Sequence, residues 1–279
     1  MNRIAGHEEH KDRALPAEKK HLQGYSWLPV LLIWLAIWQV AYLWVGQDLL
    51  LASPRQVLMS LVRQVAQTAF WKTSLYSLLR IQAGFLLGLF CGSLLAVLTV
   101  RFIWLKKFFH PVISAIRSTP VASFIILALV WMSHQSVVVF IVFLMVLPIV
   151  WGNVAEGIEK TSRQLLEMGQ VFRLSKLDTV RYIYIPSIAP FFTAAATTSL
   201  GLGWKAGIAA EVLSRPPLSL GGRLYDAKIY LETADLLAYT GVVIVISLTL
   251  ERLLVLIFRS AGRYFQLHGL TGRKAETDS

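Results

Sequence analysis

Ionisable side chains that lie inside or at the border of long apolar stretches include Arg80, Arg117, Lys205 and Glu211. A charge within a bilayer is costly, so such residues commonly contact a transported ion or polar solute, or pair with one another. Lys205 and Glu211 are six residues apart, which is not a spacing that brings side chains together on one helix. Each is expected to meet a partner on another helix, so a structural role is as well supported as a transport role. Arg80 is expected to extend toward the membrane surface.

The sequence contains no set of residues that matches a known catalytic motif. The sequence has no Gly-x-x-x-x-Gly-Lys-[Ser/Thr] phosphate loop, no His-Glu-x-x-His and no Gly-x-Ser-x-Gly. The six histidines lie in tails and at loop ends, and the single cysteine, Cys91, lies in an apolar run. We therefore predict a chain with no catalytic residues and no metal site. Any nucleotide that drives its function would be hydrolysed by another subunit.

The composition is typical of a membrane protein. Hydrophobic residues make up 56% of the 279 residues. Charged residues make up 15%, against about 25% in soluble proteins. The formal net charge is +11, but the basic residues lie between apolar blocks and form no single stripe. This arrangement favours membrane lipids over nucleic acid as the neighbours of the basic residues.

The apolar residues fall into separate stretches that predict an all-α integral membrane protein with six transmembrane helices. These stretches are 27–46, 73–100, 110–133, 137–152, 187–210 and 238–258. Pro120 is expected to break the third, so that Arg117 faces a cavity or the cytoplasmic interface, and Pro148 is expected to kink the end of the fourth. Gly84, Gly88 and Gly92 recur at every fourth position of the second, which is typical of close helix packing.

The distribution of basic residues predicts the orientation. Of the 27 Lys and Arg residues, 18 lie in 1–26, 101–110, 153–186 and 251–279, whereas six lie in the loops of the opposite side. Because cytoplasmic loops are enriched in Lys and Arg, both termini are expected in the cytoplasm. The expected organisation is a transmembrane domain, 27–259, between cytoplasmic tails, 1–26 and 260–279.

The polar segment 153–186 contains a characteristic spacing of Glu167, Ile183 and Pro186. It resembles the cytoplasmic signature of the permease subunits of binding-protein-dependent ABC importers. That signature reads Glu-Ala-Ala, three residues, Gly, nine residues, Ile, one residue, Leu-Pro. All three residues match their signature positions with the spacing intact.

The other signature positions differ. Met168-Gly169 stands where the signature has Ala-Ala, and Ile185 replaces the Leu. Arg173 occupies the place of the Gly, which is the main departure and leaves the local turn geometry open.

The resemblance extends over residues 74–259. Stretches 74–88, 111–131 and 203–213 are similar to the nitrate/sulfonate/taurine branch of this family. It implies the type I ABC importer permease fold. It also implies a permease homodimer, since the chain has one six-helix set, together with an ATP-binding ABC subunit that holds ATP and Mg, and an external substrate-binding protein. The implied solute is a sulfonate, taurine, nitrate or a vitamin precursor.

The signature also implies which residues couple the chain to the ATPase. They are Glu167, Met168, Gly169, Gln170, Val171, Phe172, Arg173, Ile183 and Pro186. An apolar stripe that includes Leu165 supports a short amphipathic helix that lies in a groove of a partner. A helix on the membrane surface without a partner fits the same periodicity.

The translocation pathway is expected along the second to fifth spans. The candidate pathway residues are Ser118, Thr119, Ser123, Thr197, Thr198, Trp204, Lys205 and Glu211. The alternative function is an ion-coupled secondary transporter, which would need acidic groups at mid-membrane and inverted repeats. Glu211 keeps that alternative open, and a membrane-embedded enzyme is the third possibility.

Overall fold

The chain is helical throughout the part that the structure describes. This computed structural model describes the backbone of residues 27–271 and the side chains of residues 28–260. Within these ranges helices are joined by short turns and no strand forms. Five of these helices are long and apolar enough to cross a membrane, and up to six spans result if a bent helix pair is one of them. The predicted all-helical fold is confirmed, while the expected tail 1–26 lies outside the described residues.

Three long helices form the centre: α3 (Thr68–Arg101), α6 (His134–Glu159) and α9 (Ile185–Ser214). The glycines of α3 allow α6 to approach closely. A β-carbon on Gly84 would come within 2.5 Å of the carbonyl oxygen of Val139, and one on Gly88 within 2.6 Å of Val146 Cβ. The packing role predicted for these glycines is confirmed, and it explains why small residues recur along α3.

The predicted break at Pro120 is also confirmed. α4 (Ile103–Ser118) and α5 (Val121–Leu129) meet at an angle of 102°. A residue before proline is sterically pushed into extended geometry, and Thr119 has φ −85° and ψ 132°. The predicted start of the third span, residue 110, is too late. α4 begins directly after the extended residue Phe102 and continues through Pro111.

Two other helices exceed their predicted ranges. α6 runs past Pro148 to Glu159, so the polar residues after the apolar stretch continue the helix. The polar segment 153–186 and the predicted span 187–210 meet after Pro186, but in the structure Pro186 lies in the first turn of α9. Proline fits there because the first amides of a helix have no partner within it. α8 (Lys176–Thr179) and the π-helical turn η1 (Val180–Tyr184) lead directly into α9.

The remaining helices lie around this centre. α1 (Trp27–Val45) contacts α2 (Pro54–Val65), which begins with a capping box of Ser53 and Gln56. α10 (Leu220–Ile229) packs on α9 and α11 (Thr233–Thr271). The expected C-terminal tail, 260–279, is helical as far as Thr271, because α11 continues beyond its apolar stretch, and residues 272–279 lie outside the described part.

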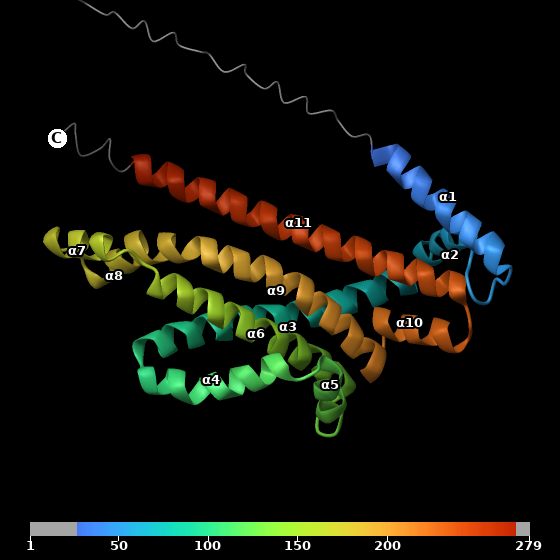
Figure 1. Ribbon diagram of the computed structural model, residues 1–279, viewed down its shortest axis with the longest axis horizontal. Helices are drawn as coiled ribbons and strands as arrows, with labels where there is room; N and C mark the ends of the chain where they lie inside the picture. The colour runs from blue at the N-terminus through green and yellow to red at the C-terminus, as the bar shows by residue number, and fades with distance from the viewer. Residues whose placement is uncertain (1–26, 272–279) are drawn as a thin grey trace, which may run out of the picture.

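The bundle has two distinct ends. Figure 1 shows α7 (Arg163–Val171) and α8 beyond one end of α9, and α10 and α2 at the other. Features near α7 and features near α10 are therefore separated by the length of the spanning helices.

Candidate functional site

Residues 163–186, called the signature segment below, begin with α7 and turn back at Arg173. The amide of Leu174 donates to the carbonyl of Gly169 at 2.9 Å, and the amide of Arg173 donates to that of Gln170 at 3.0 Å. These bonds form a Schellman cap, which usually has a left-handed glycine after the helix end. Arg173 has a φ of 53° and so adopts this conformation. The turn is kept without its glycine, at a cost of about 1–2 kcal/mol.

Gly169 brings the two ends of the signature segment together. It is buried, and a β-carbon there would lie 3.0 Å from Ile183 Cδ1 and 3.4 Å from Leu174 Cδ1. Ile183 is itself buried and belongs to the π-helical turn that leads into α9. α7 is therefore packed against the start of a spanning helix, and close packing of this kind transmits displacement.

The outward side of the signature segment is apolar. Val171, Phe172 and Leu177 are 80%, 72% and 78% exposed. Glu167 and Gln170 are exposed polar residues on the same short helix. Exposed apolar side chains with polar neighbours at one end of the bundle are typical of a protein docking surface.

The other predicted coupling residues take ordinary places in this segment. Met168 is exposed on α7, and Pro186 is exposed in the first turn of α9.

A cavity of about 430 Å³ lies between the bent pair α4–α5 and the central helices α6 and α9. Its wall is apolar except for Arg117, Thr119 and Lys205, so the expectation that Arg117 faces a cavity is confirmed. Arg117 Nη2 donates to the carbonyl oxygen of Pro148 at 2.6 Å, and its guanidinium lies 6.0 Å from the ring centre of Trp151.

Of the eight residues predicted for the pathway, Thr119 and Lys205 line this cavity. The other six lie outside its lining: Ser118, Ser123, Thr197, Thr198, Trp204 and Glu211. Trp204 is buried, and its Nε1 donates to the carbonyl oxygen of Val243 at 3.2 Å, so it joins α9 to α11.

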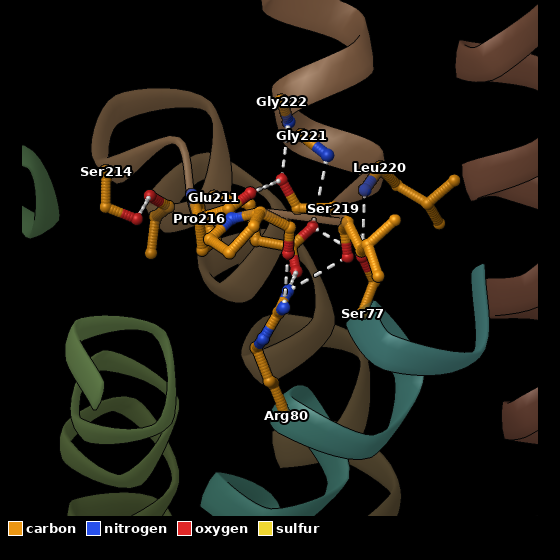
Figure 2. A network of polar contacts seen from close by, with 12 residues as sticks. Ser77, Arg80, Glu211, Ser214, Pro216, Ser219, Leu220, Gly221 and Gly222 are labelled. Carbon is orange, nitrogen blue, oxygen red and sulfur yellow. Dashed lines mark hydrogen bonds and ion pairs between the residues drawn. The ribbon is translucent and has the colours of Figure 1, made fainter. Parts of the chain in front are cut away.

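Glu211 belongs to a buried polar network at the α10 end, shown in Figure 2. Arg80 Nη1 lies 3.2 Å from Glu211 Oε1, and Ser77 Oγ donates to Glu211 Oε2 at 2.7 Å. Arg80 also donates to the carbonyl oxygens of Pro217 at 2.6 Å and Leu218 at 3.2 Å. Arg80 therefore extends toward the loop at this end of the bundle, where an acid on a neighbouring helix and two loop carbonyls hold its side chain.

The same network fixes the start of α10 against α3 and α9. The amide of Leu220 donates to Ser77 Oγ at 2.8 Å, and the amide of Gly221 donates to Glu211 Oε2 at 3.1 Å. A carboxylate at a helix N-terminus also interacts favourably with the helix dipole. A β-carbon on Gly221 would lie 2.4 Å from Glu211 Cβ and 2.6 Å from the amide nitrogen of Val212. The network therefore depends on glycine at this position.

Sequence reasoning missed Ser77 and Gly221. A signal for Ser77 was present, since it lies three residues before Arg80 and extends the small-residue side of α3 that carries Gly84. Nothing in the sequence marked Gly221, because its role depends on how closely α10 approaches α9.

No group of three His, Cys, Asp or Glu side chains that could hold a metal ion forms among the described residues.

Comparison with known proteins places this architecture in context. Residues 84–263 match the family described as binding-protein-dependent transport system inner membrane component. The matched region contains most of α3, the bent pair, the signature segment and α9.

Three relatives cover most of the chain. The nitrate import permease protein NrtB of Synechococcus elongatus is 31% identical over 205 residues, which are 70% of this chain and 73% of that protein. The putative aliphatic sulfonates transport permease protein SsuC of Escherichia coli is 27% identical, over 79% of this chain and 84% of its own length. The taurine transport system permease protein TauC of Escherichia coli is 23% identical, over 85% and 87%.

Proposed function

Because the chain belongs to the family of binding-protein-dependent transport system inner membrane components, we propose that it is the membrane permease subunit of an ATP-driven ABC importer. It translocates a small solute that a separate substrate-binding protein delivers. The solute is a sulfonate, taurine, nitrate or a vitamin precursor, and the names of three relatives support the first three. The chain carries no catalytic step, and the partner ATPase binds ATP and Mg.

One observation carries this proposal: α7 ends in exposed apolar side chains, and its Gly169 contacts Ile183 of the turn η1, which leads into α9. Val171 and Phe172 present a surface that an ATPase groove would cover, and Glu167 is placed to contact its rim. Helix-in-groove docking uses this combination of a short amphipathic helix and apolar anchors.

The coupling path follows from the contacts. Closure of the ATPase dimer on ATP displaces α7, and the contact of Gly169 with Ile183 passes the displacement to η1 and α9. α9 carries Lys205 on the wall of the cavity, so its displacement reshapes the passage. The mechanism is alternating access, in which a passage between two permease copies opens alternately to either side.

A second permease copy completes the importer. α5 and the turn after it expose apolar side chains beside the cavity, including Ile126, Leu127, Val130 and Trp131. A homodimer interface over this region would cover them and place two cavities at the dimer axis. The binding protein docks at the opposite end from α7, on the surface around α10.

The orientation follows from the charges and from the ends of the bundle. The basic loops, together with α7, face the cytoplasm, and α10 faces outward across the bacterial inner membrane. Both termini are then cytoplasmic, and lipids contact the exposed apolar faces.

The ion-coupled secondary transporter is less well supported. Such a transporter needs an acid that exchanges ions near mid-membrane. Glu211 lies in the last turn of α9, where Arg80, Ser77 and Gly221 occupy its oxygens.

Association with the ATPase tests the proposal. Phe172→Asp places a charge on the docking surface and should abolish co-purification of the ATPase encoded with this chain, as should Glu167→Arg. Tyr230→Asp is the matched control, because Tyr230 is 73% exposed at the other end and its substitution should leave the ATPase bound. Retention of a stoichiometric ATPase by both α7 variants would contradict the proposal.

A further inference from the structure

The cavity beside the bent pair lies level with the middle of a spanning helix. Four of its lining residues, Leu144, Met145, Pro148 and Ile149, are at the middle of α6 (His134–Glu159). Arg117 and Lys205 line the same cavity from α4 and α9. Two cations thus reach a depth at which charged side chains are rare and commonly mark a transport path.

These cations lack the acidic partner that Arg80 has. Arg80 is paired with Glu211 at 3.2 Å. Among the ion pairs formed by described residues none includes Arg117 or Lys205, and no acidic residue lines the cavity. Arg117 donates to the carbonyl oxygen of Pro148, which holds its guanidinium at the wall but cancels no charge. The cavity therefore carries a net positive charge.

The surroundings strengthen that charge. Apart from the two cations and Thr119, the lining consists of apolar side chains and the proline of α6. Electrostatic interactions are stronger beside an apolar wall of low dielectric constant than in bulk water, so this lining favours an anion close to the two cations.

We propose that Arg117 and Lys205 make this cavity an anion-selecting passage, which admits small solutes bearing a sulfonate, carboxylate or inorganic oxyanion and disfavours cations. This inference rests on the proposed function as a permease and narrows its solute to anions. The two cations lie on different helices, and Lys205 lies on α9, into which the signature segment leads. Movement of α9 therefore changes the separation of the two cations, and this change alters the affinity of the cavity for the anion.

The test uses the only cysteine of the chain. Cys91→Ser removes it, and Ala209→Cys then places a thiol on the cavity wall while both cations remain. The full-length protein in phosphatidylcholine liposomes is treated with sulfonatoethyl methanethiosulfonate or with its trimethylammonium analogue. The rate at which each reagent labels the cysteine is divided by the rate at which the same reagent reacts with 2-mercaptoethanol, which corrects for the intrinsic reactivity of the reagent. Leu202→Cys, on the same wall, is a second reporter.

The expected ratio of the anionic to the cationic rate exceeds about 10, and it falls by at least that factor when Arg117 and Lys205 are both changed to Gln. Lys228→Gln, an exposed cation on α10, is the control and should leave the ratio unchanged. A ratio near 1, a ratio insensitive to the two substitutions, or no reaction at either cysteine would overturn the proposal. Loss of the preference on adding phosphatidylglycerol would also overturn it, because lipid headgroups would then be the ligand.

The outcome is independent of the importer assignment. ATPase binding is measured separately with the α7 variants. If the cavity prefers the anionic reagent but no ATPase binds, the importer assignment is refuted and the anion passage stands. If the ATPase binds but the cavity shows no anion preference, the anion passage is refuted and the importer assignment stands.

Discussion

Gly169 packs against Ile183, so the helix α7 at the start of the signature segment contacts the turn η1 just before α9. This contact joins α7 to the turn that leads into a spanning helix, and close packing of this kind transmits displacement. The absence of a side chain at Gly169 allows α7 to lie this close.

A bulky residue at position 169 should uncouple the ATPase from transport. Gly169→Val would place its β-carbon 3.0 Å from Ile183 Cδ1 and add methyl groups beyond it, which crowds the contact between α7 and η1. We expect the ATPase to remain bound while solute-stimulated ATP hydrolysis falls at least about tenfold, because a misplacement near 1 Å can cost two orders of magnitude in rate.

The double variant Gly169→Val with Ile183→Ala makes space for the added methyl groups and should restore part of the stimulation. Full stimulation in Gly169→Val alone would show that this contact transmits nothing.

Arg173→Gly should stabilise the cap of α7 by about 1 kcal/mol, since glycine adopts a positive φ without the steric cost. Slower hydrogen exchange of the amide of Leu174, which donates within the cap, would report this. Arg173→Ala removes the same charge but keeps the backbone cost, so it should not slow exchange. Equal exchange in the two variants would assign the effect to charge.

Gly221→Ala should destabilise the outer end of the bundle. Its β-carbon would overlap Glu211 Cβ at 2.4 Å and the backbone of Val212, neither of which can rotate away. We expect a loss of about 1–3 kcal/mol, as for other overpacked sites, seen as a lower midpoint of thermal unfolding in detergent. Gly201→Ala is the control, because a β-carbon there meets nothing within 4 Å. A drop of equal size in the control would contradict this account.

Arg80→Gln should destabilise the fold by about 3–5 kcal/mol, because it leaves the buried Glu211 without a counter-charge. Glu211→Gln combined with Arg80→Gln removes both charges and should cost much less than the sum of the two single variants. Thermal unfolding of the four proteins gives the coupling energy. Additive losses would mean that the pair contributes no interaction.

The sequence predicted those features that depend on local chemistry. Pro120 restricts Thr119 and so breaks the third span, and the spacing of Gly84 and Gly88 marks the face that meets α6. The family resemblance located the signature segment but left the turn at Arg173 open. The backbone answers that question, since arginine there takes the left-handed conformation.

Other features depended on tertiary contacts and could not be predicted. Arg80 has the same apolar sequence surroundings as Lys205, yet one is paired and the other lines a cavity. The difference arises from which helix lies opposite each residue. Pro186 likewise ends a helix or begins one according to the preceding turn, and the π-helical turn η1 made it a helix start.

Site-specific crosslinking at Val171 tests the central claim most directly. Val171 is 80% exposed on the signature segment, and a photoreactive benzoylphenylalanine placed there in the assembled transporter should crosslink to the ATPase subunit. The same group at Tyr230, exposed at the opposite end, should not. Crosslinking of residue 171 to lipid alone, with the ATPase captured from position 230 or from neither, would contradict the claim that α7 couples this chain to ATP hydrolysis.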